Sequence, residues 1–290
     1  MNSYSYEIGG ISLDIFSPKC HVIHSEPFFS HRIVSAIEQP FNISIINSGL
    51  PETHSLECLA DIEAQSPGFS ITRWKVFKSG NDYLVEIPKH FDNQKMILKV
   101  ATGSKNWELF VSDDCIEINP FSHPLGSLLQ YFMVSESGGI LIHAGGVEFQ
   151  GKGILFAGVS GKGKSTITRL FVDAGAKLIH DDRIILLKKE QEFHMHTSPV
   201  HPGDMPASAI VNEIFLIDHG QQNHAISLCG AAANVGILGN CIQHNYDRYY
   251  AERRLDIITD LTQKTHITKL RFLPDSSVVD FIRKTHLSND

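Results

Sequence analysis

Hydrophobic and polar residues alternate in short runs through residues 1–120 of this chain. The runs YSYEIGGISLDIF, KMILKV and WELFV have the two-residue period of half-buried strands, and turn residues separate them. The break SGND between WKVF and YLVEI, within residues 74–87, is typical of a hairpin. The pattern predicts a β-rich N-terminal domain over residues 1–120 with a role in substrate or partner recognition.

From residue 121 onward, helical and strand-like runs follow one another. HPLGSLLQYFMVSES, STITRLFVDAG, DRYYAERRLDIITDLTQ and SVVDFIRK have helical spacing, and Gly175 is the expected end of the second. GILIHAGGVEF, GILFAG, NEIFLID and HITKLRFL are apolar strands, and AKLIHDDRIILLKK is a strand, an acidic corner and a strand. The pattern therefore predicts a mixed α/β domain over residues 121–290.

A phosphate-binding loop is predicted between two of these elements. GVSGKGKS, residues 158–165, matches G-x-x-x-x-G-K-[ST], with an apolar strand before it and a helix after it. In such a loop, backbone N–H groups and the helix N-terminus converge on phosphate. Lys164 is expected to reach the β- and γ-phosphates of a nucleotide, and Ser165 to ligate Mg²⁺. Lys162 is expected to face solvent. The residues predicted to bind the nucleotide are Gly158, Ser160, Gly161, Lys162, Gly163, Lys164, Ser165 and Thr166.

Two further groups are expected beside the loop. Asp181 and Asp182 follow a strand that would return beside it, so one carboxylate could hold the metal and the other accept a proton. The residues alone do not choose between the two, and a solvated turn with Arg183 paired to an acid is the alternative. His143 lies on the strand before the loop, and the hairpin to GILFAG would bring its strand end back to the loop. The alternative is a core histidine with its hydrogen bonds satisfied.

Composition limits the classes of protein. A net charge of −7 disfavours nucleic-acid binding, and no apolar run approaches the roughly 18 residues of a membrane span. The N-terminus has neither the basic start nor the apolar core of a signal peptide. The cysteines lack CxxC spacing, as in a cytoplasmic protein with reduced thiols. They are Cys20, Cys58, Cys115, Cys229 and Cys241.

Two histidines near residue 195 require a separate interpretation. His194 and His196 alternate on one face of a predicted edge strand that leads into a substrate-facing loop at residues 198–208. No acidic partner follows at a suitable spacing, so no zinc site is predicted.

A family resemblance covers residues 141–187, LIHAGGVEFQGKGILFAGVSGKGKSTITRLFVDAGAKLIHDDRIILL. A strand with His143, a hairpin, the phosphate loop, a helix ending near glycine and an Asp-Asp-Arg corner follow in order. This segment resembles the catalytic core of HPr kinase/phosphorylase and its relatives. These include kinases of modified-peptide gene clusters and, more distantly, phosphoenolpyruvate carboxykinase. The resemblance implies that residues 121–290 form a P-loop kinase domain of this type.

The resemblance also implies roles and partners. Asp181 would be the base that takes the proton of an acceptor hydroxyl, Asp182 would support Mg²⁺ or the corner, and His143 would line the phosphate site. The expected activity is ATP- and Mg²⁺-dependent phosphoryl transfer to a hydroxyl, preferably a serine of a peptide or protein. A kinase of a small hydroxylated metabolite and a non-catalytic nucleotide-dependent binding module are the alternatives. The residues do not distinguish ATP from GTP. Homo-oligomeric assembly is also implied.

The chain departs from the bifunctional enzymes of this family at two places. Thr166 stands where those enzymes have glutamate after the loop serine. The proline-rich SPVHPGDMPAS, residues 198–208, occupies the region of their E-x-R-G-x-G segment. Neither HPr as the substrate nor the reverse, phosphorolytic reaction is therefore expected.

Overall fold

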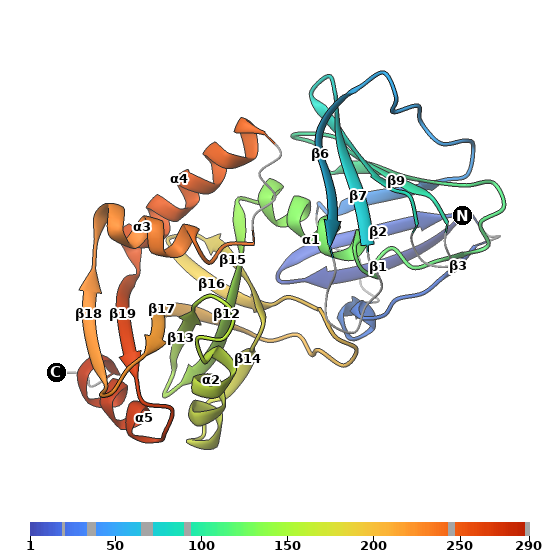
Figure 1. Cartoon of the computed structure of the whole chain (residues 1–290). Coiled ribbons are helices and arrows are strands. Elements are labelled where there is room, and N and C mark those ends of the chain that lie inside the picture. Colours follow the sequence, from blue (N-terminus) through green and yellow to red (C-terminus); the bar gives the residue numbers. More distant parts are fainter. Residues whose placement is uncertain (19–20, 34–38, 65–71, 90–93, 243–246, 288–290) are drawn as a thin grey trace. The chain divides into compact units, whose positions relative to one another are not determined.

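A computed structural model shows two compact units. Unit 1 comprises residues 1–136, 199–205 and 245–248, and unit 2 comprises residues 137–198, 206–244 and 249–290. The structure describes residues 1–18, 21–33, 39–64, 72–89, 94–242 and 247–287 (Figure 1). Cys20 lies outside the described residues.

Unit 1 is built on a mixed sheet, which within the described residues has nine strands in the order β4-β1-β2-β5-β10-β9-β8-β7-β6. The hairpin expected across SGND is confirmed, because β7 and β8 pair antiparallel with Ser79 opposite Asp82. The sheet strands are β1 (Asn2–Ile8), β2 (Ile11–Ser17), β4 (Arg32–Ile33), β5 (Phe41–Ile46), β6 (Glu57–Ala64), β7 (Thr72–Ser79), β8 (Asp82–Ile87), β9 (Met96–Val100) and β10 (Asn106–Val111). The remaining elements are β3 (Val22–Ile23), the 3₁₀ helix η1 (Phe28–His31) and β11 (Glu117–Ile118).

Helix α1 (Leu125–Glu136) belongs to unit 1 and is buried along most of its length. Its Phe132 ring lies 6.1 Å from the ring of Tyr83 on β8. Its Gln130 Nε2 donates to the Pro199 carbonyl oxygen at 3.0 Å. The boundary expected near residue 120 precedes this helix, whereas the contacts change after Glu136. The contact of Phe132 with Tyr83 is one of those that join α1 to unit 1.

Strands of unit 2 pair in a closed circuit. β12 pairs with β13 and β15, β15 with β16, β16 with β17, and β17 with β13. β14 adds to β12, while β19 and β18 continue outward from β17. The strands are β12 (Gly139–Phe149), β13 (Lys152–Ala157), β14 (Lys177–His180), β15 (Arg183–Lys189), β16 (Glu192–Thr197), β17 (Ser208–His219), β18 (His224–Leu228) and β19 (His266–Phe272).

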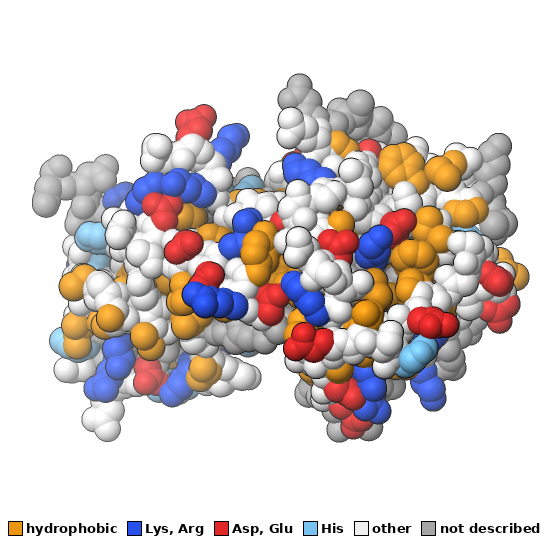
Figure 2. Space-filling view, turned by 90° about the horizontal axis from the view of Figure 1, so that it is seen from above, with side chains coloured by type: hydrophobic (Ala, Val, Ile, Leu, Met, Phe, Trp, Pro, Cys, Tyr) orange, Lys and Arg blue, Asp and Glu red, His pale blue; other side chains and the backbone are white. Residues whose placement is uncertain are grey.

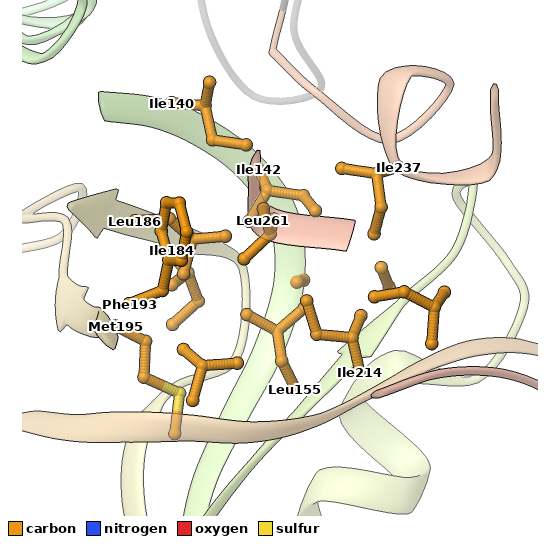
Figure 3. Packing of buried hydrophobic residues seen from close by; sticks show 14 of the residues in the cluster. Ile140, Ile142, Leu155, Ile184, Leu186, Phe193, Met195, Ile214, Ile237 and Leu261 are labelled. Atoms are coloured by element: carbon orange, nitrogen blue, oxygen red, sulfur yellow. The ribbon is translucent and has the colours of Figure 1, made fainter. Parts of the chain in front are cut away.

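The helices of unit 2 cover two apolar clusters. Alternate residues of β13 divide between them, with Leu155 in one cluster and Ile154 and Phe156 in the other, as the two-residue period of a strand requires. Figure 3 shows the first cluster, which includes Ile237 of α3 and Leu261 of α4. The second cluster contains residues of α2 and α5. The helices are α2 (Lys164–Asp173), α3 (Gly230–Leu238), α4 (Arg248–Lys264) and α5 (Ser277–Ile282), followed by the π-helix η3 (Arg283–Leu287).

Charged side chains of both signs are mixed on the face of the surface shown in Figure 2. No helix in the described part of the chain is long and apolar enough to cross a membrane. Cys58, Cys115, Cys229 and Cys241 are free thiols.

The expectation that residues around His194 and His196 form an edge strand is wrong. β16 lies between β15 and β17, with His196 opposite Ile185 on one side and Ser208 on the other. A polar face suggested an edge, but pairing with the distant β17 closes that side of the strand. No group of three His, Cys, Asp or Glu side chains among the described residues is arranged to hold a metal ion.

His196 should make unit 2 sensitive to acid. Burial, with smaller effects of His194 and Lys189, lowers the pKa of His196 from 6.5 to about 4. The folded state thus favours the neutral imidazole, so this contribution to stability is full above pH 6.5 and is lost as the pH falls towards 4. Acidification from pH 7.5 to pH 4.5 should therefore lower the free energy of unfolding by about 2–3 kcal/mol through His196.

Urea unfolding of wild type and His196→Gln at both pH values measures this contribution. The variant should lose that much less stability on acidification. His54→Gln, which changes an exposed histidine and keeps His196, should lose as much as wild type. An equal acid loss in wild type and His196→Gln would contradict the prediction.

Candidate functional site at the phosphate loop

The predicted loop joins β13 to α2, as its sequence context indicated. Gly161 and Gly163 have φ angles of 83° and 89°, which favour glycine. A Cβ atom at Gly163 would also lie 3.0 Å from the Phe272 ring. These two positions therefore require glycine for the observed backbone.

Backbone donors at the start of α2 are available to an anion. Ile167 N donates to the Gly163 carbonyl oxygen at 2.9 Å and closes the first turn. The N–H groups of Lys164, Ser165 and Thr166 precede it and have no intrahelical acceptor. Gly163 provides no side-chain cap for them. Their positions fit a phosphate group.

Lys164 is held in a fixed orientation inside the loop. Its side chain is buried, and Nζ donates to the carbonyl oxygens of Gly158 at 2.7 Å and Val159 at 3.3 Å. An ammonium group has three donors, so one remains for a ligand. Burial lowers the pKa of Lys164, and the Asp182 carboxylate partly opposes that shift. The loop lysine and the acidic corner therefore act on each other electrostatically.

β12 connects the acidic corner with the start of the loop. Ala144 lies opposite Ala157, the last residue of β13, and Ala144 N donates to the Asp182 carbonyl oxygen at 3.2 Å. His143 lies opposite Arg183 on β15. The strand from Lys177 reaches the site by pairing with β12, and β12 pairs in turn with the strand that leads into the loop.

The two aspartates of the corner have different surroundings. His143 Nε2 lies 3.3 Å from Asp182 Oδ1, and Arg183 Nε lies 3.4 Å from Asp182 Oδ2. The hydrogen bond with His143 is the main cause that lowers the pKa of Asp182, and Arg183 adds to it. The Asp181 side chain is exposed and has no ion pair or hydrogen bond with another described residue. The alternative for this corner was a turn in which Arg183 pairs with an acid. Arg183 does make such an ion pair, with Asp182.

His180 is a part of the corner to which the sequence pattern assigned no role. It is buried, and its Nδ1 accepts from Asp182 N at 3.2 Å and from Arg183 N at 3.1 Å. The ring therefore fixes the turn that presents both aspartates. A polar residue directly before a tight turn was the available signal.

Lys162 is partly exposed and is also held by an ion pair. Its Nζ donates to Asp218 Oδ1 at 2.8 Å, and both side chains are half-buried. Asp218 ends the run IFLID on β17, so four apolar residues before an acid were the available signal. Ser160, Ser165 and Thr166 are exposed at the loop and in the first turn of α2.

The site residues have the chemistry to hold a phosphate group together with Mg²⁺. The loop offers backbone N–H groups and one ammonium group for phosphate, while Ser165 and Asp182 offer the oxygen ligands that Mg²⁺ prefers. Asp181 offers an exposed carboxylate that no other described side chain pairs with.

Comparisons with known proteins give one family and one distant structure. A family model described as "SynChlorMet cassette protein ScmC" matches residues 125–270, half of the chain. No curated protein matches. The matching solved structures include that of the Hpr(Ser) kinase/phosphatase from Coxiella burnetii. It is 12% identical, covers 51% of this chain and 99% of its own, and gives a TM-score of 0.31. These values describe a distant similarity of fold and nothing more specific.

Proposed function

This chain belongs to the family described as SynChlorMet cassette protein ScmC, and from its loop and corner we propose that it is a kinase. The proposed reaction transfers the γ-phosphate of ATP to a hydroxyl, with Mg²⁺ as the cofactor. A serine of a peptide or protein is the proposed acceptor. The resemblance of residues 141–187 to HPr-kinase-like enzymes motivates this choice of acceptor.

One observation carries the proposal. His143 and Ala144, adjacent on β12, both bind Asp182, and Ala144 also pairs with the residue that precedes the phosphate loop. A solvated acidic turn on its own would have no such connection with a buried loop lysine. The arrangement therefore supports a site in which phosphate-binding and proton-accepting groups act together.

Each group has a distinct proposed task. The N–H groups at the start of α2 and the Lys164 ammonium bind the β- and γ-phosphates. Asp181 accepts the proton of the acceptor hydroxyl, and the oxygen of that hydroxyl forms a bond to the γ-phosphorus. The bond from that phosphorus to the bridging oxygen breaks, and ADP leaves. Bound Mg²⁺, held by Ser165 and Asp182, supplies neutralisation of the developing negative charge.

His143 and His180 are proposed to prepare the corner for this reaction. His143 and Arg183 keep Asp182 ionised, as the lowered pKa of that carboxyl indicates. His180 holds the turn in which Asp181 is exposed. Positioning and charge neutralisation then supply most of the acceleration, as is usual in phosphoryl transfer.

The test is Mg²⁺-dependent formation of ADP by the full chain, with water as the acceptor in a first assay. We expect slow ADP release that requires Mg²⁺ and stops with a chelator. His143→Gln should lower it, whereas His224→Gln, which changes an exposed residue of β18, should not. Tight ATP binding without ADP formation would instead favour the nucleotide-dependent binding module.

A further inference from the structure

We propose that Asp218 and His219, at the end of β17, are positioning residues that hold the phosphate loop in its ligand-binding conformation. This inference rests on the proposed nucleotide site, because it assigns these residues to the same loop.

The topology places this pair at the loop. β17 lies parallel to β13, and Leu216 is opposite Ala157, the last residue of β13. The two strands therefore reach the same edge of the sheet together. β13 continues there into the phosphate loop, and β17 continues into Asp218 and His219.

Each member of the pair holds one of two successive loop residues. His219 Nε2 donates to the Gly161 carbonyl oxygen at 2.9 Å. Asp218 Oδ1 accepts from Lys162 Nζ at 2.8 Å and from His219 N at 2.9 Å. The hydrogen bond from Lys162 is the main cause that lowers the pKa of Asp218. Two contacts from a paired strand therefore restrain the tip of the loop.

The neighbouring strand β19 supports the histidine ring. Phe272, fully buried, stacks on His219 with ring centroids 6.4 Å apart and an interplanar angle of 26°. The same Phe272 ring lies against Gly163. His219 is thus held between a fixed aromatic ring and the Gly161 carbonyl group.

The restraint extends to the lysine that binds phosphate. In a trans peptide, the carbonyl and the following N–H point in opposite directions. By holding the Gly161 carbonyl, His219 also sets the direction of Lys162 N, which donates to the Val159 carbonyl oxygen at 3.2 Å. That same oxygen accepts from Lys164 Nζ. The contact at His219 therefore connects through one peptide plane to the orientation of Lys164.

The first test is calorimetry of His219→Ala and His219→Gln with two probes, Mg²⁺–ATP and inorganic pyrophosphate. The alanine variant loses one hydrogen bond that pre-organises the loop, so both probes should bind about 3- to 10-fold more weakly. The glutamine amide nitrogen can replace the Nε2 donor, so His219→Gln should remain within about twofold of wild type. His224→Ala is the matched control, as an exposed histidine on β18.

A double-mutant cycle tests Asp218 through Lys162. Asp218→Ala should weaken Mg²⁺–ATP binding in the wild-type chain by about threefold and should have a smaller effect in Lys162→Ala, where only its bond from His219 N remains to be lost. Tighter binding in the wild-type background would show that Asp218 acts only as a charge that repels the ligand, and it would overturn its assignment.

The outcomes separate this inference from the proposed function. A wild-type chain that binds neither probe would remove the nucleotide site itself. Normal binding by wild type and by His219→Ala would leave the site in place and overturn the positioning role. A loss for ATP alone, with pyrophosphate unchanged, would also overturn it, because the loop contacts phosphate. Should the alanine variant fail to fold, His219→Asn, whose amide is too short for Gly161, replaces it against His219→Gln.

Discussion

Asp181→Asn should retain nucleotide binding and lose turnover by about 10²–10⁴-fold, the usual contribution of a positioned general base. Asparagine keeps the size of the side chain but cannot accept the proton. Its neutral amide also removes one negative charge beside the phosphates, so the affinity for ATP should be equal or slightly higher. The exposed carboxylate makes no hydrogen bond with another described side chain, so the substitution should leave the fold intact.

Calorimetry with Mg²⁺–ATP and an ADP-release assay measure the two effects separately. Retained binding with lost turnover is the pattern of a contact made in the transition state. Asp173→Asn, at the end of α2, is the matched control and should change neither.

A comparison with Asp182→Asn tests the division of roles within the corner. That substitution weakens the pair with His143 and removes a carboxylate that is proposed to hold Mg²⁺. We therefore expect Mg²⁺ to activate ADP release less effectively. If Asp181→Asn lost binding while Asp182→Asn kept binding and lost turnover, the base and the metal ligand would be exchanged. Unchanged turnover in both variants would contradict the kinase proposal.

Lys164→Ala should weaken Mg²⁺–ATP binding by about 10- to 100-fold, in the range of a hydrogen bond to a charged group. The substitution removes the ammonium group that is proposed to bind the phosphates. It also removes the Lys164 donor from the Gly158 and Val159 carbonyl oxygens, although Val159 keeps its bond from Lys162 N. A small loss of stability without nucleotide is therefore expected as well.

Lys164→Met separates charge from packing, because methionine keeps most of the buried stem. It should bind nucleotide as poorly as the alanine variant while recovering part of its stability. Lys177→Ala changes an exposed lysine at the start of β14 and should bind like wild type. Undiminished affinity of both Lys164 variants would mean that residues 158–165 do not bind the phosphates.

The sequence pattern was informative wherever the relevant contacts are local. The strand, loop and helix around Lys164 could be predicted because glycine spacing, apolar strand and helical run are all adjacent in the chain. The hairpin of β12 and β13 could be predicted for the same reason. Its turn uses positive φ angles at Gln150 and Gly151, where the chain reverses over two residues.

Pairing between distant segments was not predictable in the same way. β16 has the polar face of an edge strand but pairs on both sides, because β17 returns to it beyond a long loop. The chain also changes units after α1, because that helix belongs to unit 1. In both places the local periodicity indicates which face is apolar. It does not indicate which distant segment pairs with the strand or packs against the helix.

The sequence by itself determined the strand, loop and helix around residues 158–165, the acidic corner and the mixed α/β class, because each depends on the spacing of neighbouring residues. Only the tertiary structure decided which carboxylate is held. His143 reaches Asp182 through pairing of β12 with β15, and Asp181 is left exposed. Likewise, Lys162 meets Asp218 because β13 and β17 run in parallel to the same edge of the sheet. Strand pairing brings these residues together across long separations in the chain, and residue spacing alone carries no information about such contacts.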